Sequence, residues 1–315
     1  MSSSHPAWTE RLEGRRPLRC YDGLLALIGD TPLLKLRKVT ADLPSAVEVW
    51  VKLELMNPGG SVKDRPARQI ILDAIERGDL REGRTLIDAT SGNTGIAYAM
   101  IGAALGVEIH LVMPENVSPQ RKEIVQAYGA KIIYSDPMEG SDGAIRLAHR
   151  ILKEDTEGRY FYADQYSNPS NPKAHELTTA KEIWEQTQGR VTHFVTCTGT
   201  SGTVMGTGRG LKNYNPAIKI LGGQPADSFH GLEGLKHMPS SIVPAIYDET
   251  SLDGVLWIDT EDGWDMAEIL ARTEGLACGN SAGANVVAAL RVAQSLEEGV
   301  VVTVICDHAD RYFGE

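Results

Sequence analysis

Short apolar runs of β-strand character alternate with helical patterns along most of this chain, and this alternation constrains its fold more than any other feature. A repeated strand, helix and strand order favours a mostly parallel sheet covered by helices on both faces. The expected strands are 48–55, 84–89, 107–113, 131–135, 193–197, 218–222 and 300–306, and the expected helices are 64–77, 94–105, 119–128, 141–153, 203–211 and 282–296. The sequence therefore predicts an α/β fold.

Domain organisation follows from length and from one segment of distinct composition. The 315 residues suggest two domains. The segment Asp164 to Lys173 is rich in Asn, Pro and Ser and is typical of a crossing between two α/β halves. We expect two doubly wound, mostly parallel-sheet domains, a smaller one at 56–165 and a larger one at 16–55 plus 166–315, and a flexible tail at 1–15.

Charge and composition exclude several classes of protein. The net charge of −11 argues against a nucleic-acid binder, which needs a basic face. No apolar stretch is long enough to span a bilayer, and Met1 to Arg19 lacks the apolar middle of a signal peptide. We therefore expect a cytoplasmic protein without a membrane or nucleic-acid partner. The four cysteines form no CxxC pair, which argues against a disulfide framework and against a zinc site.

One lysine stands where covalent chemistry is favoured. Lys63 lies in the run Asn57 to Arg65, behind a Pro/Gly turn and at the mouth of an expected helix. A lysine in this place suits a Schiff base with an aldehyde cofactor, although most lysines are solvated surface groups. Three further turns rich in Gly and hydroxyl residues, at 91–95, 199–203 and 279–283, each follow a β-like run. Ligands of α/β folds bind at this end of the strands.

The 199–203 turn suits a phosphate group. Its glycines permit close backbone approach, and the helix that follows directs free N–H groups at a ligand. The alternative is a plain glycine turn without a ligand. Downstream, Gly206, Gly208 and Gly210 fall inside the helical pattern, so we interpret them as packing glycines rather than as a dinucleotide fingerprint. The candidate phosphate residues are Gly199, Thr200, Ser201, Gly202 and Thr203.

The remaining two turns suit a carboxylate and a pyridine ring. The 91–95 turn, with Thr90 before it, offers hydroxyls and backbone N–H groups that can hold a carboxylate at a helix N-terminus. Asn93 could donate a hydrogen bond to a phenolate oxygen, and the hydroxyl of Ser281 could bond a pyridine nitrogen without protonating it. For both turns the alternative is an ordinary helix N-cap, because Ser and Asn are favoured there.

Taken together, these stretches resemble the fold type II family of pyridoxal-phosphate enzymes, which is tryptophan synthase β-like, and within it the cysteine synthases. The similarity runs over nearly the whole chain from Ile28 onward, and several ordered motifs are far more specific than any single one. The matching motifs are NPGGSVKDR (57–65), ATSGNTGIA (89–97), DQYSNPSNPKAH (164–175), GTSGT (199–203), GNSAGA (279–284) and ICDHADRY (305–312).

The resemblance assigns roles by position. It implies that pyridoxal 5'-phosphate is bound by Lys63 as a Schiff base, by Asn93 at the ring hydroxyl, by the 199–203 loop at the phosphate and by Ser281 at the ring nitrogen. The larger domain would bind this cofactor, and the smaller, mobile one would carry the substrate loop. The implied substrate-binding residues are Thr90, Ser91, Gly92, Thr94, Gln165 and Lys236.

The resemblance also implies a reaction. In this family O-acetyl-L-serine undergoes β-replacement with sulfide or thiosulfate through an α-aminoacrylate, giving L-cysteine or S-sulfocysteine and acetate. Lys63 would be the catalytic base. The resemblance implies a homodimer as well. The stretch 234–247 is similar to B-type isozymes, which often carry an arginine at the position of Lys236, where the chain keeps the charge but loses the bidentate fork.

The sequence leaves several alternative functions open. Asn280 and Ala282 resemble the corresponding turn of cystathionine β-synthases, which condense serine with homocysteine. An O-phosphoserine-dependent cysteine synthase and a serine or threonine dehydratase are further enzyme readings. Two further alternatives are not enzymes. One is a catalytically idle scaffold that binds a partner's C-terminal carboxylate, and the other is a nucleotide-binding regulator.

Overall fold

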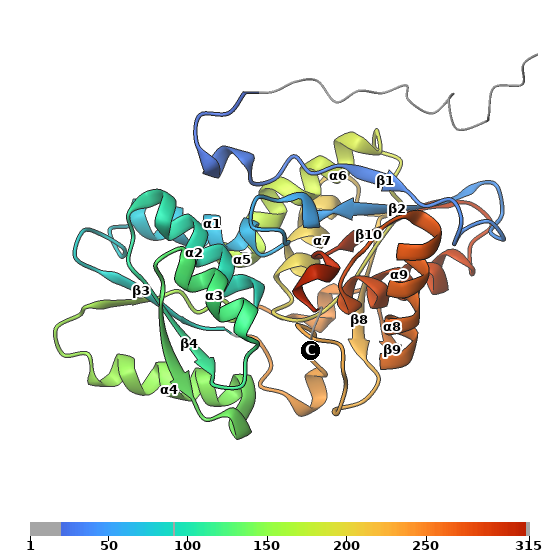
Figure 1. Ribbon diagram of the computed structural model, residues 1–315. Coiled ribbons are helices and arrows are strands. Elements are labelled where there is room, and N and C mark those ends of the chain that lie inside the picture. Colours follow the sequence, from blue (N-terminus) through green and yellow to red (C-terminus); the bar gives the residue numbers. More distant parts are fainter. Residues whose placement is uncertain (1–19, 91, 313–315) are drawn as a thin grey trace, which may run out of the picture.

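The computed structural model describes residues 20–90 and 92–312. Its strands form two separate sheets that lie side by side, each with helices on both faces (Figure 1). The tail predicted at 1–15 and the predicted substrate residue Ser91 lie outside the described residues. The α/β class with two mostly parallel, helix-covered sheets is confirmed.

The larger sheet contains six strands in the order β1-β2-β10-β7-β8-β9. All neighbouring pairs are parallel except β1 with β2, where Leu33 pairs with Lys52 in the antiparallel sense. The strands are β1 Leu33–Lys35, β2 Val47–Leu53, β7 His193–Cys197, β8 Lys219–Pro225, β9 Gly254–Ile258 and β10 Gly299–Ile305.

The smaller sheet contains four parallel strands in the order β5-β4-β3-β6. Its two central strands are buried along their whole length, as expected for strands with helices on both faces. The strands are β3 Thr85–Ala89, β4 Ile109–Pro114, β5 Lys131–Ser135 and β6 Tyr160–Tyr162.

Nine α-helices cover the two sheets in the described part of the chain. Helices α2 and α3 lie on one side of the smaller sheet and α4 on the other, while α8 and α9 pack together on one face of the larger sheet (Figure 1). The helices are α1 Asp64–Glu76, α2 Asn93–Leu105, α3 Pro119–Ala127, α4 Gly140–Glu154, α5 Ser170–Ala174, α6 Ala180–Gln186, α7 Gly202–Tyr214, α8 Thr260–Ile269 and α9 Asn280–Ala293.

Every strand and helix predicted from the sequence is present, with ends that differ by three residues or fewer. Six elements carried too weak a signal to be predicted. The strands β1 and β6 have three residues each, too few for a visible alternation, and β9 is a partly exposed edge strand. Helices α5 and α6 are joined by a π-helical turn, His175–Thr179, which breaks the helical period. The sixth is α8.

The hydrophobic core lies on both faces of each sheet. One cluster packs α1 and α2 against the smaller sheet, and another packs α9 against the larger one. The glycines of α7 confirm the packing interpretation, because a methyl group at Gly208 would come within 2.7 Å of Ile220 on β8. Methyl groups at Gly206 and Gly210 would overlap the segment around α5 and α6.

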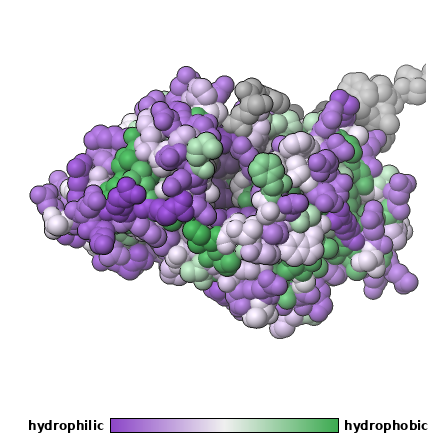
Figure 2. All heavy atoms as spheres, turned by 90° about the horizontal axis from the view of Figure 1, so that it is seen from below, coloured by the Kyte–Doolittle hydropathy of each residue, from purple (hydrophilic) through white to green (hydrophobic). Residues whose placement is uncertain are grey.

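Hydrophilic residues cover most of the face shown in Figure 2, with hydrophobic patches between them. This agrees with acidic residues that are spread along the chain instead of gathered in a tail. None of the helices in the described part of the chain has the length and apolar character that crossing a membrane requires.

Candidate active site

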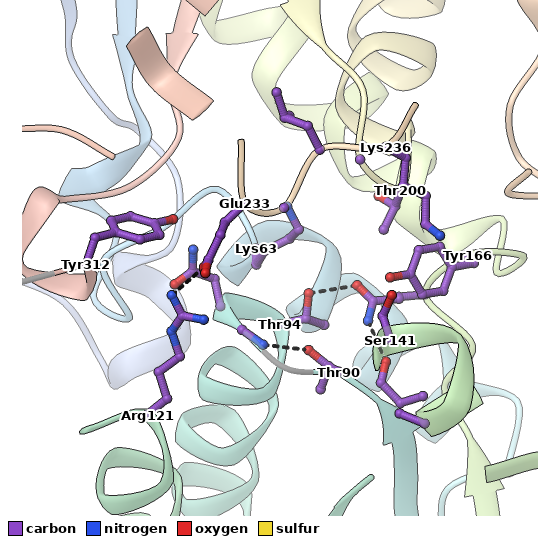
Figure 3. A pocket seen from close by; sticks show the side chains of 18 residues that line it. Lys63, Thr90, Thr94, Arg121, Ser141, Tyr166, Thr200, Glu233, Lys236 and Tyr312 are labelled. Atoms are coloured by element: carbon purple, nitrogen blue, oxygen red, sulfur yellow. Dashed lines mark hydrogen bonds and ion pairs between the residues drawn. The ribbon is translucent and has the colours of Figure 1, made fainter. Parts of the chain in front are cut away.

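Nearly all of the predicted site residues meet at one pair of adjoining cavities. The outer cavity has a volume of about 170 Å³ and the inner one of about 60 Å³, and Lys63, Asn93, Gly199 and Thr200 line both. Lys63 lies in the middle of the site in Figure 3, with Arg121 and Tyr312 to one side and Tyr166 to the other. The cavities lie beyond the carboxyl ends of β3, β7 and β10, where ligands of parallel sheets bind.

Lys63 is the N-cap residue of α1, and the turn before it is fixed by backbone contacts. The N–H of Val62 donates to the carbonyl of Cys306 at 2.8 Å, which ties the turn to the end of β10. The N–H of Gly59 donates to the Asp64 carboxyl at 2.5 Å, and its carbonyl accepts from Arg311 at 2.5 Å. These contacts hold the lysine at the start of the helix.

A buried ion-pair network holds α1 itself. The Arg65 guanidinium lies 2.6 Å from a carboxylate oxygen of Glu54 and 2.6 Å from one of Glu182, and Arg65 and Glu54 are fully buried. Burial alone would raise the pKa of Glu54, but the charge and hydrogen bonds of Arg65 lower it to about 2. Because Glu54 lies in the turn directly after β2 and Glu182 lies in α6, the network fixes α1 against the larger sheet.

The 199–203 turn forms an anion cradle at the N-terminus of α7. Ser201 has a positive φ of 71° at the N-cap, and its buried hydroxyl has no partner among the described residues. A methyl group at Gly199 would overlap the carbonyl of Gly234, and one at Gly202 would overlap the side chain of Asn171. The free N–H groups of a 13-residue helix and an unpaired hydroxyl suit a phosphate. Gly202 supports the cradle from behind and does not line either cavity.

A second helix N-terminus, that of α2, carries the predicted carboxylate site. The Thr94 hydroxyl donates to Gln165 Oε1 at 2.8 Å, and Gln165 Nε2 donates to the carbonyl of Ala89 at 3.0 Å (Figure 3). Thr90, Gly92, Thr94 and Gln165 all line the outer cavity. Their hydroxyl and amide groups, with the positive end of the helix dipole, favour a bound anion.

The inner cavity holds Ser281, Cys306 and Asp307. Ser281 lies in the first turn of α9, is 6% exposed, and lies next to the end of β10. Burial raises the pKa of the Cys306 thiol to about 12, so this thiol is protonated and unreactive at neutral pH. Ser281 offers this cavity a neutral hydroxyl, which could donate a hydrogen bond to a pyridine nitrogen.

Lys236 lies at the rim of the outer cavity, where it already has two partners. Its ammonium lies 3.7 Å from a carboxylate oxygen of Asp142 and 5.1 Å from the ring centre of Tyr166. The side chain is largely buried, with 9% of the residue exposed. The lysine thus faces the site but shares its charge with an acid from α4.

Several residues that line the cavities were not predicted from the sequence. Asp307 and Tyr312 lie in the ICDHADRY motif but received no role, although Asp307 follows a strand end, where site residues concentrate. Arg121 and Glu233 meet at 2.7 Å across 112 positions of sequence, and Figure 3 shows this pair beside Lys63. No local pattern reveals such a pair. The described residues contain no group of three or more His, Cys, Asp or Glu side chains that could hold a metal ion.

A family model described as "Pyridoxal-phosphate dependent enzyme" matches residues 24–307. The chain is 53% identical to a cysteine synthase of Aquifex aeolicus over 299 residues, 93% of this chain and 91% of the relative. It is 44% identical to cysteine synthase B of Pseudomonas aeruginosa over 292 residues, 93% of this chain and 96% of the relative. The crystal structure of O-acetyl serine sulfhydrylase isoform 3 from Entamoeba histolytica matches with a TM-score of 0.90 and 37% identity, covering 96% and 92% of the two chains.

Two helix-covered parallel sheets with a lysine and an anion cradle between them define an α/β enzyme that uses a phosphorylated cofactor. The chain belongs to the family of pyridoxal-phosphate dependent enzymes. The resemblance found in the sequence is thereby confirmed. The roles of the individual site residues stay predictions.

Proposed function

We propose that this protein is a cysteine synthase, which replaces the acetyl group of O-acetyl-L-serine with sulfide and releases L-cysteine and acetate. One observation carries the proposal: Lys63, the anion cradle and the predicted carboxylate site at the N-terminus of α2 all line one cavity. The cysteine synthase names of relatives that match over most of their length support it.

The cradle fits the phosphate of pyridoxal 5'-phosphate. The hydroxyl of Ser201, which has no partner within residues 20–90 and 92–312, and the N-terminus of α7 would hold the phosphate oxygens, and Gly199 leaves them room. The Ser281 hydroxyl would donate a hydrogen bond to the ring nitrogen, and the Asn93 amide would donate one to the ring hydroxyl oxygen. When bound, the cofactor supplies an aldehyde that condenses with amines and withdraws electrons from the adjoining carbon.

Lys63 would first hold the cofactor and then move a proton. The substrate's amine would take the place of its ε-amino group, and the freed Lys63 amine would accept the proton from Cα of the substrate. Lys63 is the N-cap residue of α1 and lines both cavities, so the same side chain can reach the cofactor and the substrate. Acetate would leave from Cβ, sulfide would add to the same carbon, and Lys63 would return its proton to Cα, which completes the exchange.

The N-terminus of α2 would orient the substrate. Thr90, Thr94 and Gln165 grip the carboxylate and thereby fix Cα in front of Lys63. Because this turn belongs to the unit at 56–165, substrate capture would draw that unit towards the larger one and exclude water. The domain boundaries and this movement are part of the proposal.

We also propose which sulfur donors the site accepts and how the chain assembles. Lys236 at the rim is suited to an anionic donor such as thiosulfate, which would give S-sulfocysteine, in competition with Asp142. We also expect a homodimer and a cytoplasmic location, as the sequence predicts. Sedimentation velocity would test the dimer, and a monomer at micromolar concentration would contradict it.

The main experiment offers O-acetylserine, O-phosphoserine and serine separately to the yellow, cofactor-loaded protein. We expect O-acetylserine to change the visible absorption most, and sulfide to restore it with release of cysteine. Turnover only with serine and homocysteine would favour a cystathionine β-synthase, turnover only with O-phosphoserine would identify the other leaving group, and no turnover would favour a carboxylate-binding scaffold.

Lys63→Ala provides the matched control. It should lose both the lysine-bound absorbance and turnover, the latter by at least about a thousandfold. Borohydride trapping with peptide mapping should place the cofactor on the peptide that contains Lys63 in the unchanged protein. A label on another lysine would overturn the proposal.

A further inference from the structure

Asp307 lies where three segments of the site meet. It follows β10, its backbone is bridged to Ser61 in the turn before Lys63, and its carbonyl accepts from the N–H of Gly279 at 3.3 Å. A methyl group at Gly279 would overlap the Asp307 carboxyl, so these two turns are in close contact. The residue thus joins the lysine turn to the turn that carries Ser281.

The side chain of Asp307 is a buried acceptor with two strong donors. Its Oδ2 accepts from Asn93 Nδ2 at 2.6 Å and from the Tyr312 hydroxyl at 2.5 Å. The residue is 1% exposed, and in the part of the chain that the structure describes its Oδ1 has no partner. Short hydrogen bonds to a buried carboxylate are among the stronger ones in proteins.

These contacts determine how the amide of Asn93 is oriented. An amide can present either its oxygen or its nitrogen, but the Asp307 oxygen that faces Asn93 acts as an acceptor, since it also accepts from the Tyr312 hydroxyl. Asp307 therefore holds the nitrogen of Asn93 on its own side and uses one of the two N–H groups. The second N–H meets no other protein group among residues 20–90 and 92–312, and Asn93 lines both cavities.

We infer that Asp307 is a positioning residue of this site: it orients the Asn93 amide so that one N–H is free for the cofactor. The inference rests on the proposed role of Asn93 and adds a residue to which that proposal gave no part. Tyr312 is the second element of the device, because its hydroxyl occupies the same carboxylate oxygen and limits the rotation of the carboxyl group.

Asp307→Asn is the variant that tests the inference. The new amide can donate as well as accept, so the Asn93 amide is free to turn over. We expect the dissociation constant of pyridoxal 5'-phosphate, titrated into the cofactor-free full chain, to rise about tenfold, the loss of one hydrogen bond to a charged group. We also expect the visible absorption maximum of the bound cofactor to shift.

Asp310→Asn is the matched control. It makes the same substitution three positions away, on a side chain that is 63% exposed and pairs with His308. Its cofactor affinity should stay within twofold of the unchanged protein. Thermal unfolding of the cofactor-free forms would separate a local effect from a general loss of stability.

If Asp307→Asn does not fold, Tyr312→Phe replaces it, because this change leaves the carboxyl in place and removes one of its donors. A shifted absorption maximum in a protein of normal cofactor-free stability supports the inference. The inference is overturned if the variant that folds, Asp307→Asn or Tyr312→Phe, has the same cofactor affinity and the same absorption spectrum as Asp310→Asn. Failure of the proposed function would instead appear in the unchanged protein, as normal cofactor binding without turnover.

Discussion

Glu54 and Asp88 are equally buried near the site, yet their pKa values shift in opposite directions. Glu54 has the Arg65 guanidinium beside it, and its pKa falls to about 2 although burial opposes this. Asp88 near the end of β3 accepts the N–H groups of Ala89 at 2.9 Å and Gln165 at 3.3 Å, which are uncharged donors. Burial therefore dominates and raises the pKa of Asp88 to about 7. A paired cation makes the difference.

This difference predicts how the stability of the protein depends on pH. Asp88 holds its proton more tightly when folded, with a pKa of about 7 against 3.8 for the ordinary group. As pH rises from about 4 to 7 the unfolded chain loses the proton first, so stability falls. Asp88→Asn imitates the protonated acid and should remove roughly 2 to 4 kcal/mol of this fall.

Urea unfolding at pH 4.5 and pH 7.5 would measure the effect. Asp64, whose pKa burial also raises to about 7, contributes equally to both proteins and cancels in the comparison. Asp265→Asn, on the exposed face of α8, serves as the control and should keep the pH dependence of the unchanged protein. An equal slope in the Asp88 and Asp265 variants would contradict the prediction.

Lys236 is the second residue with a measurable individual effect. Its charge at the rim should favour anionic sulfur donors, so Lys236→Ala should reduce kcat/KM for thiosulfate several times more than kcat/KM for sulfide. Asp142→Asn should act in the opposite direction, because it frees the ammonium from its 3.7 Å partner. Equal losses for both donors in Lys236→Ala would assign the residue a structural role.

At the scale of elements, the site depends on helices that begin at it. Helices α2, α7 and α9 each direct an N-terminus at the cavities, and α1 begins with Lys63 as its N-cap. The position of α7 depends in turn on close packing. Its glycines bring the helix against β8 and against the segment that contains α5, so side chains there would move the cradle.

Gly206→Ala tests this packing. A methyl group there would overlap the carbonyl of Pro172 and lie 2.9 Å from the Cβ of His175. We expect a loss of about 1 to 3 kcal/mol in unfolding free energy, despite alanine's better helix propensity. Gly254→Ala on β9, where the nearest atom would be 3.6 Å away, is the control and should be nearly neutral in the same urea titration. A stabilised Gly206→Ala protein would refute the packing argument.

At the scale of the whole molecule, two ion pairs connect the sheets across the mouth of the site. Arg121 of α3 donates to Glu233 at 2.7 Å (Figure 3), and the Lys236 ammonium lies 3.7 Å from the carboxylate of Asp142 of α4. The two partners from the larger unit are the ends of the segment Glu233 to Lys236. In this segment the carbonyl of Gly234 lies so close to Gly199 that a methyl group there would overlap it. This segment forms one rim of the cavity and joins it to the smaller unit.

Weakening one of these pairs should favour the open form. We expect Glu233→Gln to raise KM for O-acetylserine two- to fivefold, as befits a half-exposed ion pair, without changing the cofactor spectrum. Added salt should raise KM in the unchanged protein and have less effect in the variant. Glu268→Gln is the control, because it breaks an exposed pair between Glu268 of α8 and Arg272 in the turn that follows, and neither residue lines the cavities. An unchanged or lower KM in Glu233→Gln would count against this closure.

Local patterns were sufficient to predict much of this architecture, whereas the site residues Gln165 and Lys236 were predicted only from the family resemblance. Periodicity located the long central strands and helices because burial on a sheet face imposes it, and glycine turns marked where Lys63, Asn93 and Ser281 enter the cavities. Short edge elements such as β1 and β6 escaped, since three residues cannot display a period.

The chain by itself determined which elements form and which chemical groups they present, because strand and helix periods, turn residues and helix termini are properties of neighbouring positions. Only the tertiary structure decided that Asp307 bonds Asn93 across 214 positions, and that Lys236 shares its charge with Asp142. Hydrogen bonds and ion pairs act over a few ångströms of space, and packing alone determines which distant residues come that close.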